Sequence, residues 1–80
     1  MEPEVEMLTE ALYHISKAFR SLDLVELRLG YEGTEDIATR IEDLKEKVDQ
    51  CWEELLYVIT DLKGVMEQLR MLEEMREEGA

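Results

Sequence analysis

The chain has 80 residues, 45% of them hydrophobic and 38% charged, and its 21 acidic and 9 basic residues give a net charge of −12. This length fits one small domain, and the composition is typical of long helices and coiled coils. The acidic balance argues against direct binding of nucleic acid or of an anionic membrane, because both need clustered Lys and Arg. A basic protein remains a suitable partner.

Several features of the sequence bear on the location of the protein and on its source. The first residues, MEPEVEM, are acidic and show no signal or transit peptide, and no apolar run reaches transmembrane length. A single cysteine, Cys51, cannot form an internal disulfide, so we expect a cytoplasmic protein. The absence of Asn and the many Glu residues are typical of proteins from thermophiles.

The first predicted helix covers about residues 3–29. Pro3 suits a first helical position, and Glu4 and Glu6 favour the positive end of the helix dipole. Apolar residues then recur in steps of three and four, at Val5, Leu8, Leu12, Ile15, Phe19 and Leu22. Ala11, Ala18 and Val25 widen this line into a face suited to a helical bundle.

The segment 21–31 allows more than one interpretation. Val25, Leu27, Leu29 and Tyr31 alternate with polar residues or glycine, which is the period of a strand. A lone strand has no partner in so short a chain, so we expect the helix to end near Leu29, with Gly30 as a left-handed cap. A break at Ser21, followed by a short separate helix, is the alternative.

The second predicted helix covers about residues 35–78, after a loop at 30–34 in which Thr34 offers a hydroxyl cap. It carries an unbroken heptad pattern. The a positions are Ile41, Val48, Leu55, Leu62 and Leu69, and the d positions are Ile37, Leu44, Cys51, Val58, Val65 and Leu72. Trp52, Ile59 and Met66 at e positions broaden the apolar face, and Gly64 falls at an exposed c position.

The helices differ in length, and this difference predicts association. In an antiparallel hairpin with equal rise, facing residue numbers sum to about 64, so the first helix ends opposite Ile59. The apolar residues beyond it need a partner, and we prefer a homodimer that forms a four-helix bundle. A tetramer, a different helical partner and either relative orientation stay open. The predicted oligomer interface consists of Leu55, Val58, Ile59, Leu62, Val65, Met66, Leu69 and Leu72.

Other large apolar residues fall outside the heptad seam. A cluster of this kind is covered either by an external protein or by a wider oligomer core. The residues expected to dock a partner are Leu24, Leu27, Trp52, Leu56 and Tyr57.

Candidate catalytic groups are few. Glu46 and Asp49 form an ExxD spacing that resembles the magnesium-binding motifs of all-α nucleoside triphosphate pyrophosphatases of the MazG type. In the heptad phase, however, Glu42, Asp43, Glu46, Asp49 and Glu53 point away from the apolar seam, whereas a magnesium site needs convergent carboxylates. We therefore expect a solvated acidic face.

His14 and Cys51 are the remaining residues whose side chains could act as a ligand, a base or a nucleophile. His14, with Glu10 one turn before it, falls on the outer face of the first helix, so a surface histidine is favoured over a metal ligand or base. Cys51 is expected to be a small, unreactive core residue. No zinc spacing, serine triad or glycine-rich phosphate loop is present. We therefore expect no catalytic residue, no metal and no cofactor.

The sequence thus predicts one all-α domain over residues 1–80, an antiparallel helical hairpin with a long second helix, associating into a four-helix bundle or coiled coil. The expected function is a non-enzymatic protein–protein interaction module, a small acidic scaffold or regulator. The alternative is an acidic inhibitor that mimics nucleic acid, as small viral counter-defence proteins do. A pyrophosphatase of the MazG type comes third.

Overall fold

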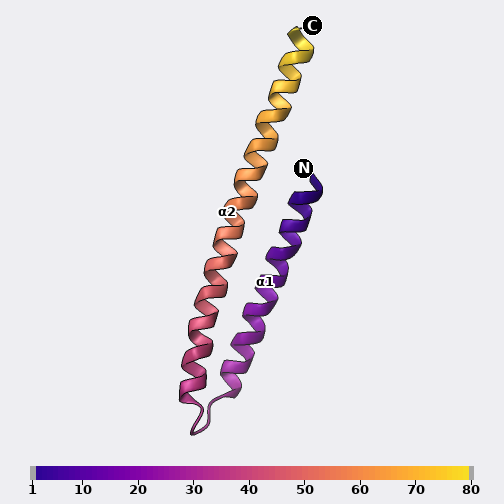
Figure 1. Cartoon of the computed structure of the whole chain (residues 1–80). Helices are drawn as coiled ribbons and strands as arrows, with labels where there is room; N and C mark the ends of the chain where they lie inside the picture. Colours follow the sequence, from indigo (N-terminus) through magenta and orange to yellow (C-terminus); the bar gives the residue numbers. More distant parts are fainter. Residues whose placement is uncertain (1, 80) are drawn as a thin grey trace.

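The computed structural model describes residues 2–79, which form an antiparallel helical hairpin (Figure 1). Helix α1 covers Glu2–Arg28 and helix α2 covers Glu35–Gly79, and the described residues contain no strand. The molecule is a rod of 74 × 16 × 11 Å. The predicted all-α hairpin with a longer second helix is therefore confirmed.

Helix α1 is continuous over its whole length. Glu2 and Glu4 lie in its first turn and Arg28 in its last, where these charges favour the helix dipole. The helix passes through Ser21 without interruption, so the alternative of a separate short helix is wrong. A lone strand would leave backbone groups unpaired, whereas a helix satisfies its own, and this explains why the alternating pattern around Val25 does not produce a strand.

The loop between the helices has its left-handed residue at Gly33, with φ of +92°. The prediction that Gly30 takes this conformation as the cap of α1 is wrong. Helix α1 ends at Arg28, and the N–H of Leu29 donates to the carbonyl of Glu26 at 3.1 Å. This tight three-residue turn closes the helix end without a positive φ.

Thr34 is buried, at 7% exposure, and joins the loop to α2. Its carbonyl accepts a hydrogen bond from the N–H of Ala38 at 2.9 Å, the first bond of the helix. Its hydroxyl oxygen lies 2.7 Å from the carbonyl of Leu29 and 2.6 Å from that of Tyr31. A capping hydroxyl accepts from a helix amide, so the predicted role is corrected: this hydroxyl shares its single hydrogen between the two loop carbonyls and holds the turn closed.

Packing between the helices is thin. Ile59, at 5% exposure, is the one buried apolar side chain among residues 2–79. Ile15 and Trp52 line one hollow together with Phe19 and Val48, so facing residue numbers sum to 67 rather than the expected 64. The other apolar residues along this line are half-buried.

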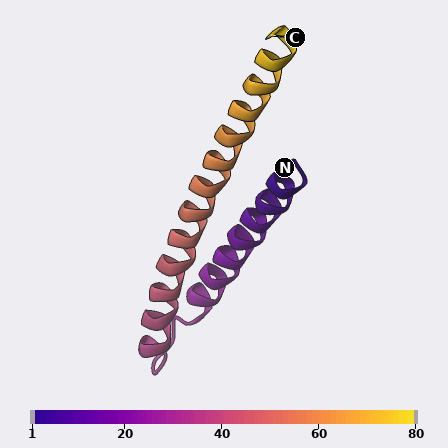
Figure 2. The ribbon, with the colours of Figure 1, turned by 45° about the horizontal axis from the view of Figure 1, so that its top comes forward.

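This register carries α1 further along α2 than predicted. Val5 and Met66 line a common hollow, and Met66 is half-buried. The half-buried part of α2 therefore extends to Met66, not only to Ile59, and Glu67 and Arg70 still line that hollow with Glu2; the residues after Met66 form an overhang. This overhang, residues 67–79, is exposed at every position and extends beyond the N-terminal end of α1 (Figures 1 and 2).

Candidate interaction surface

Helix α1 covers one edge of the heptad seam of α2. The contact line follows the a and e positions, as the burial of the side chains shows. The half-buried or buried residues of α2 are Ala38, Ile41, Lys45, Val48, Trp52, Leu55, Ile59, Leu62 and Met66. They meet a half-buried line on α1 formed by Val5, Leu8, Leu12, Ile15, Phe19 and Leu22.

The d positions of α2 are left without a partner. We call this row the open stripe; it consists of Ile37, Leu44, Cys51, Val58, Val65 and Leu72, all of them exposed. Its five aliphatic members are between 46% (Val65) and 58% (Leu72) exposed. Successive residues of a helix are about 100° apart, so the d row lies on one flank of the a/e contact line. A single helix that packs on the contact line therefore leaves the d row uncovered.

Helix α1 adds apolar residues beside the open stripe. The helices run antiparallel, so each flank of α1 meets one flank of α2. Ser16 lines a hollow with Asp49, which occupies a b position of the heptad. The flank of α1 that carries Ser16 therefore lies on the b side of α2. The opposite flank of α1 therefore meets the d side. It carries Met7, Ala11, Ala18 and Val25, and together with the open stripe these residues form what we call the open face.

An ion-pair cluster occupies the other side of the hairpin, near the loop. The Lys45 Nζ lies 2.8 Å from Asp23 Oδ1, 3.2 Å from Glu26 Oε2 and 3.5 Å from Glu42 Oε2. It also lies 5.4 Å from the centre of the Phe19 ring, within the range of a cation–π contact. The hydrogen bond to Asp23 is the largest cause that raises the pKa of Lys45; desolvation opposes it and Glu26 adds to it.

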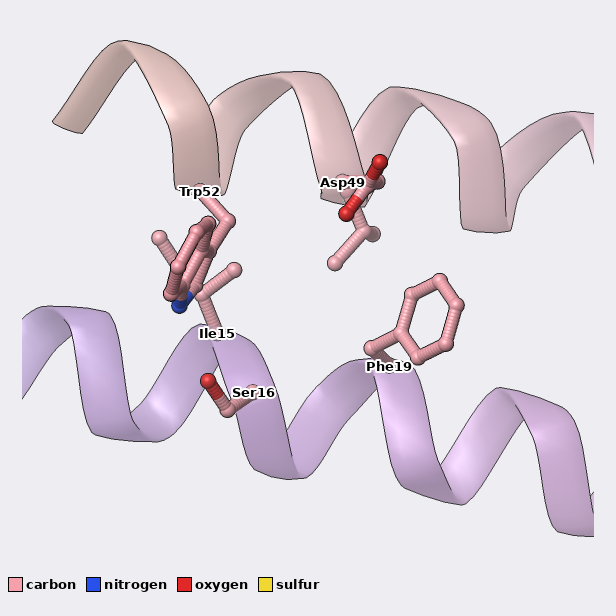
Figure 3. A pocket seen from close by; sticks show the side chains of 6 residues that line it. Ile15, Ser16, Phe19, Asp49 and Trp52 are labelled. Atoms are coloured by element: carbon pink, nitrogen blue, oxygen red, sulfur yellow. The ribbon is translucent and has the colours of Figure 1, made fainter. Parts of the chain in front are cut away.

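The same side carries a small apolar hollow of about 220 Å³. In Figure 3 the Trp52 side chain extends from α2 towards Ile15 on α1, and the Phe19 ring extends from α1 into the space between the helices. The polar groups at its edge are the hydroxyl of Ser16 and the carboxylate of Asp49. The hydroxyl also donates to the carbonyl of Leu12 at 3.1 Å. The hollow is thus an apolar recess with an acidic edge.

The structure divides the predicted oligomer interface into two groups. Leu55, Ile59, Leu62 and Met66 face α1 within the same chain. Val58, Val65, Leu69 and Leu72 are exposed and available to another molecule. The heptad pattern alone does not separate these groups, because it does not say which edge of the seam the short helix covers.

The predicted docking residues do not form one cluster. Leu24, Leu27 and Tyr57 are exposed, at 51%, 74% and 71%, and Leu56 is exposed at 40%. Trp52 is instead half-buried against α1 in the hollow. Leu56, at a b position, lies on the same side as Asp49, whereas Tyr57 points away from α1.

The other residues singled out in the sequence are exposed. Cys51 is exposed, so the prediction of a buried core thiol is wrong for the single chain; it belongs to the open stripe. His14 lies 3.7 Å from Glu10, and both side chains are largely exposed. Glu42, Asp43, Glu46, Asp49 and Glu53 are exposed. Within residues 2–79 no three His, Cys, Asp or Glu side chains lie close enough together to hold a metal ion.

Sequence reasoning missed the Lys45 cluster. The available signal was the heptad phase: Lys45 occupies an e position, in the same row as Trp52, Ile59 and Met66. A lysine in an otherwise apolar row implies a nearby carboxylate or aromatic ring to receive its charge.

Comparisons with known proteins return no match. No protein-family model matches the chain, and no similar curated protein or solved structure is found. In the part of the chain described by the structure, neither helix combines the length and the apolar character needed to cross a lipid bilayer.

Proposed function

We propose that this protein is a non-enzymatic interaction module, an acidic helical scaffold that pairs with a second copy of itself through the open face. The observation that carries the proposal is the open stripe, a row of six d positions that α1 leaves exposed over the length of α2. Ile59 is the one buried apolar side chain among the described residues. A single hairpin therefore has little core of its own.

Pairing would complete that core. Each aliphatic side chain of the open stripe is about half exposed, so its full burial contributes about 1 kcal/mol. A second hairpin placed on the open face produces a four-helix cross-section, the common solution for helices with broad apolar faces. In a reducing cytoplasm, where we place the protein, Cys51 would remain a thiol inside this core.

The outer surface of the pair would serve other proteins. The hollow beside Trp52 takes an apolar side chain, and Asp49 at its edge favours a neighbouring Lys or Arg. Together with the net charge of −12, this chemistry favours a basic partner.

The solution mass tests self-association. Light scattering over a dilution series should report a dimer for the natural chain. The double variant Val58→Asp, Val65→Asp should raise the dissociation constant at least about 100-fold, because two charges would be buried without partners. Tyr57→Asp is the matched control, since Tyr57 is 71% exposed and lies off the open face. Circular dichroism checks that each variant remains helical.

Two outcomes would refute the proposal. If the natural chain stays monomeric at every concentration, the protein does not self-associate. A dimer whose mass is unchanged in the double variant means that the pairing surface lies elsewhere.

A second candidate function is mimicry of nucleic acid. The chain spreads a net charge of −12 along 74 Å, about one charge per 6 Å. A pair of similar length would carry one per about 3 Å, close to the 3.4 Å spacing along a single nucleic-acid strand. If this function holds, the protein should displace single-stranded DNA from a basic protein that binds single strands at low salt, and the effect should vanish near 0.5 M salt. Displacement that is insensitive to salt would contradict it.

A further inference from the structure

We infer that the two copies pack with their α2 helices antiparallel, in a register in which facing residues of the two open stripes have numbers that sum to 109. This inference rests on the proposed function, because it describes the geometry of the same pair. It names a second copy of the chain as the occupant of the open face and specifies how that copy lies.

The size of the face fits such an occupant. A helix of 45 residues is about 67 Å long and about 10–12 Å wide, so one side of α2 offers about 700–800 Å². This matches the area of about 800 Å² per partner in a standard protein interface. A short peptide segment would leave most of the open stripe exposed, whereas a second α2 covers all of it.

The side chains favour the antiparallel register. A sum of 109 brings Ile37 opposite Leu72, Leu44 opposite Val65, and Cys51 opposite Val58, each pair occurring twice about the two-fold axis. All six positions then have a partner, and Leu44 always meets the smaller Val65. A parallel pair would instead place identical residues in the same layer, with two Leu44 side chains in one layer and two Cys51 side chains in the next. The side-chain volume would then differ from one core layer to the next.

Helix α1 fits the same arrangement. Facing numbers within one hairpin sum to 67 at Ile15 and Trp52 and to 71 at Val5 and Met66, so a sum of 109 between the α2 helices implies a sum of about 25–29 between the α1 helices. Met7, the largest apolar residue on this flank and 68% exposed, then lies opposite residues 18–22 of the second copy, where Ala18 leaves space for it. A large side chain again faces a small one.

The overhang is covered by the second copy only in the antiparallel pair. In the antiparallel pair, residues 67–74 of one copy lie beside residues 35–42 of the other, so the first turns of the second α2 cover Leu69 and Leu72. In a parallel pair both overhangs project from the same end, at diagonal corners of the bundle and beyond the start of both α1 helices. Their apolar side chains would stay in water there.

Distances between spin labels test the geometry. The background variant is Cys51→Ala, which frees the chain of other thiols, and Glu74→Cys carries the label on the outer side of the overhang. In the antiparallel register, residue 74 of one copy lies level with residue 35 of the other. The two labels are therefore 39 residues apart along the axis, or about 58 Å at 1.5 Å per residue. A parallel pair places them within about 25 Å, because packed helices lie 8–10 Å apart.

Glu53→Cys in the same background is the matched control. Its two labels lie within about 25 Å in both arrangements, because residue 53 is near the centre of the register. A long distance at 74 with a short one at 53 supports the inference, and a short distance at both overturns it. Light scattering on the labelled proteins separates this outcome from a failure of the proposed function, which would appear as a monomer.

Discussion

The Nζ of Lys45 on α2 lies 2.8 Å from Oδ1 of Asp23 on α1, and the lysine side chain is only 12% exposed. This is the closest ion pair between the helices in the described part of the chain. It lies on the side opposite the open face, so it fixes the two helices to each other without taking part in the proposed pairing.

We predict that Lys45→Met lowers the melting temperature of the hairpin. The methionine keeps the apolar stem, but Asp23, Glu26 and Glu42 then repel one another without a cation between them. Thermal unfolding followed by circular dichroism measures the effect. Lys47→Met is the control, because Lys47 is exposed and takes no part in this cluster. Equal melting temperatures for the two variants would show that the cluster adds no stability.

The Lys45 cluster also predicts a loss of stability at high pH. Folding raises the pKa of Lys45 above its ordinary value of 10.5. A raised lysine pKa stabilises the fold fully below the unfolded pKa, and the contribution is lost as pH rises through the folded pKa. The difference in melting temperature between the natural chain and Lys45→Met should therefore be constant from pH 7 to about pH 9.5 and shrink above about pH 10.5. A difference that persists unchanged above that pH contradicts this account.

The burial of Ile59 gives a third prediction, based on the same change at two sites. Ile59→Val removes a methylene group from the buried side chain and should reduce the free energy of unfolding by about 1 kcal/mol. Ile37→Val makes the same change where the side chain is 49% exposed and should cost about half as much in the monomer. Urea unfolding at a concentration where the chain is monomeric measures both. Equal costs would mean that Ile59 does not lie at the centre of the hairpin's packing.

Gly64 offers a stabilising substitution. It lies inside α2, and a Cβ added there meets no atom within 4 Å. Gly64→Ala should therefore raise the free energy of unfolding by about 1 kcal/mol, because alanine loses less backbone entropy in a helix. The mass of the assembly should not change, since position c points away from the open face. A variant that shifts the dissociation constant instead would place Gly64 in an interface.

The reactivity of Cys51 should report pairing directly. The thiol is exposed in the single chain but belongs to the open stripe, so its alkylation by iodoacetamide should slow as protein concentration rises through the dimer range. Tyr57→Cys in the Cys51→Ala background should react at a constant rate, because position 57 stays outside. A Cys51 rate that is independent of concentration would show that the stripe is not covered.

The sequence was sufficient for both helices and for the loop because each depends on local chemistry. Proline, acids and the apolar period define the helices, and the two glycines flank the turn. It did not distinguish Gly30 from Gly33, because that choice depends on the hydrogen bonds from the Thr34 hydroxyl to the carbonyls of Leu29 and Tyr31. Those bonds form only once the loop has closed.

The sequence also did not predict which residues of the heptad seam are covered by α1 and which are left exposed. Val58 and Ile59 are neighbours in the chain and both are β-branched, yet one is 50% exposed and the other 5%. An a/d pattern predicts that a helix has partners, but it does not predict which of the a, d and e rows contacts which partner. Position e, with Trp52, Ile59 and Met66, was the only hint that the short helix packs on that edge. The register also depended on how the loop brings the helices together, which equal rise from the turn does not determine.

The overhang has a consequence for the lifetime of the protein in a cell. Residues 67–79 of an unpaired protomer are exposed at every position and are held in place by their own helical hydrogen bonds. Helical segments this short unravel at low cost when no other surface packs on them, and an unravelled end is a substrate for proteases. Pairing would shield the greater part of this segment. Degradation would then remove lone chains and spare assembled ones, so the abundance of the protein would itself set how long each copy survives.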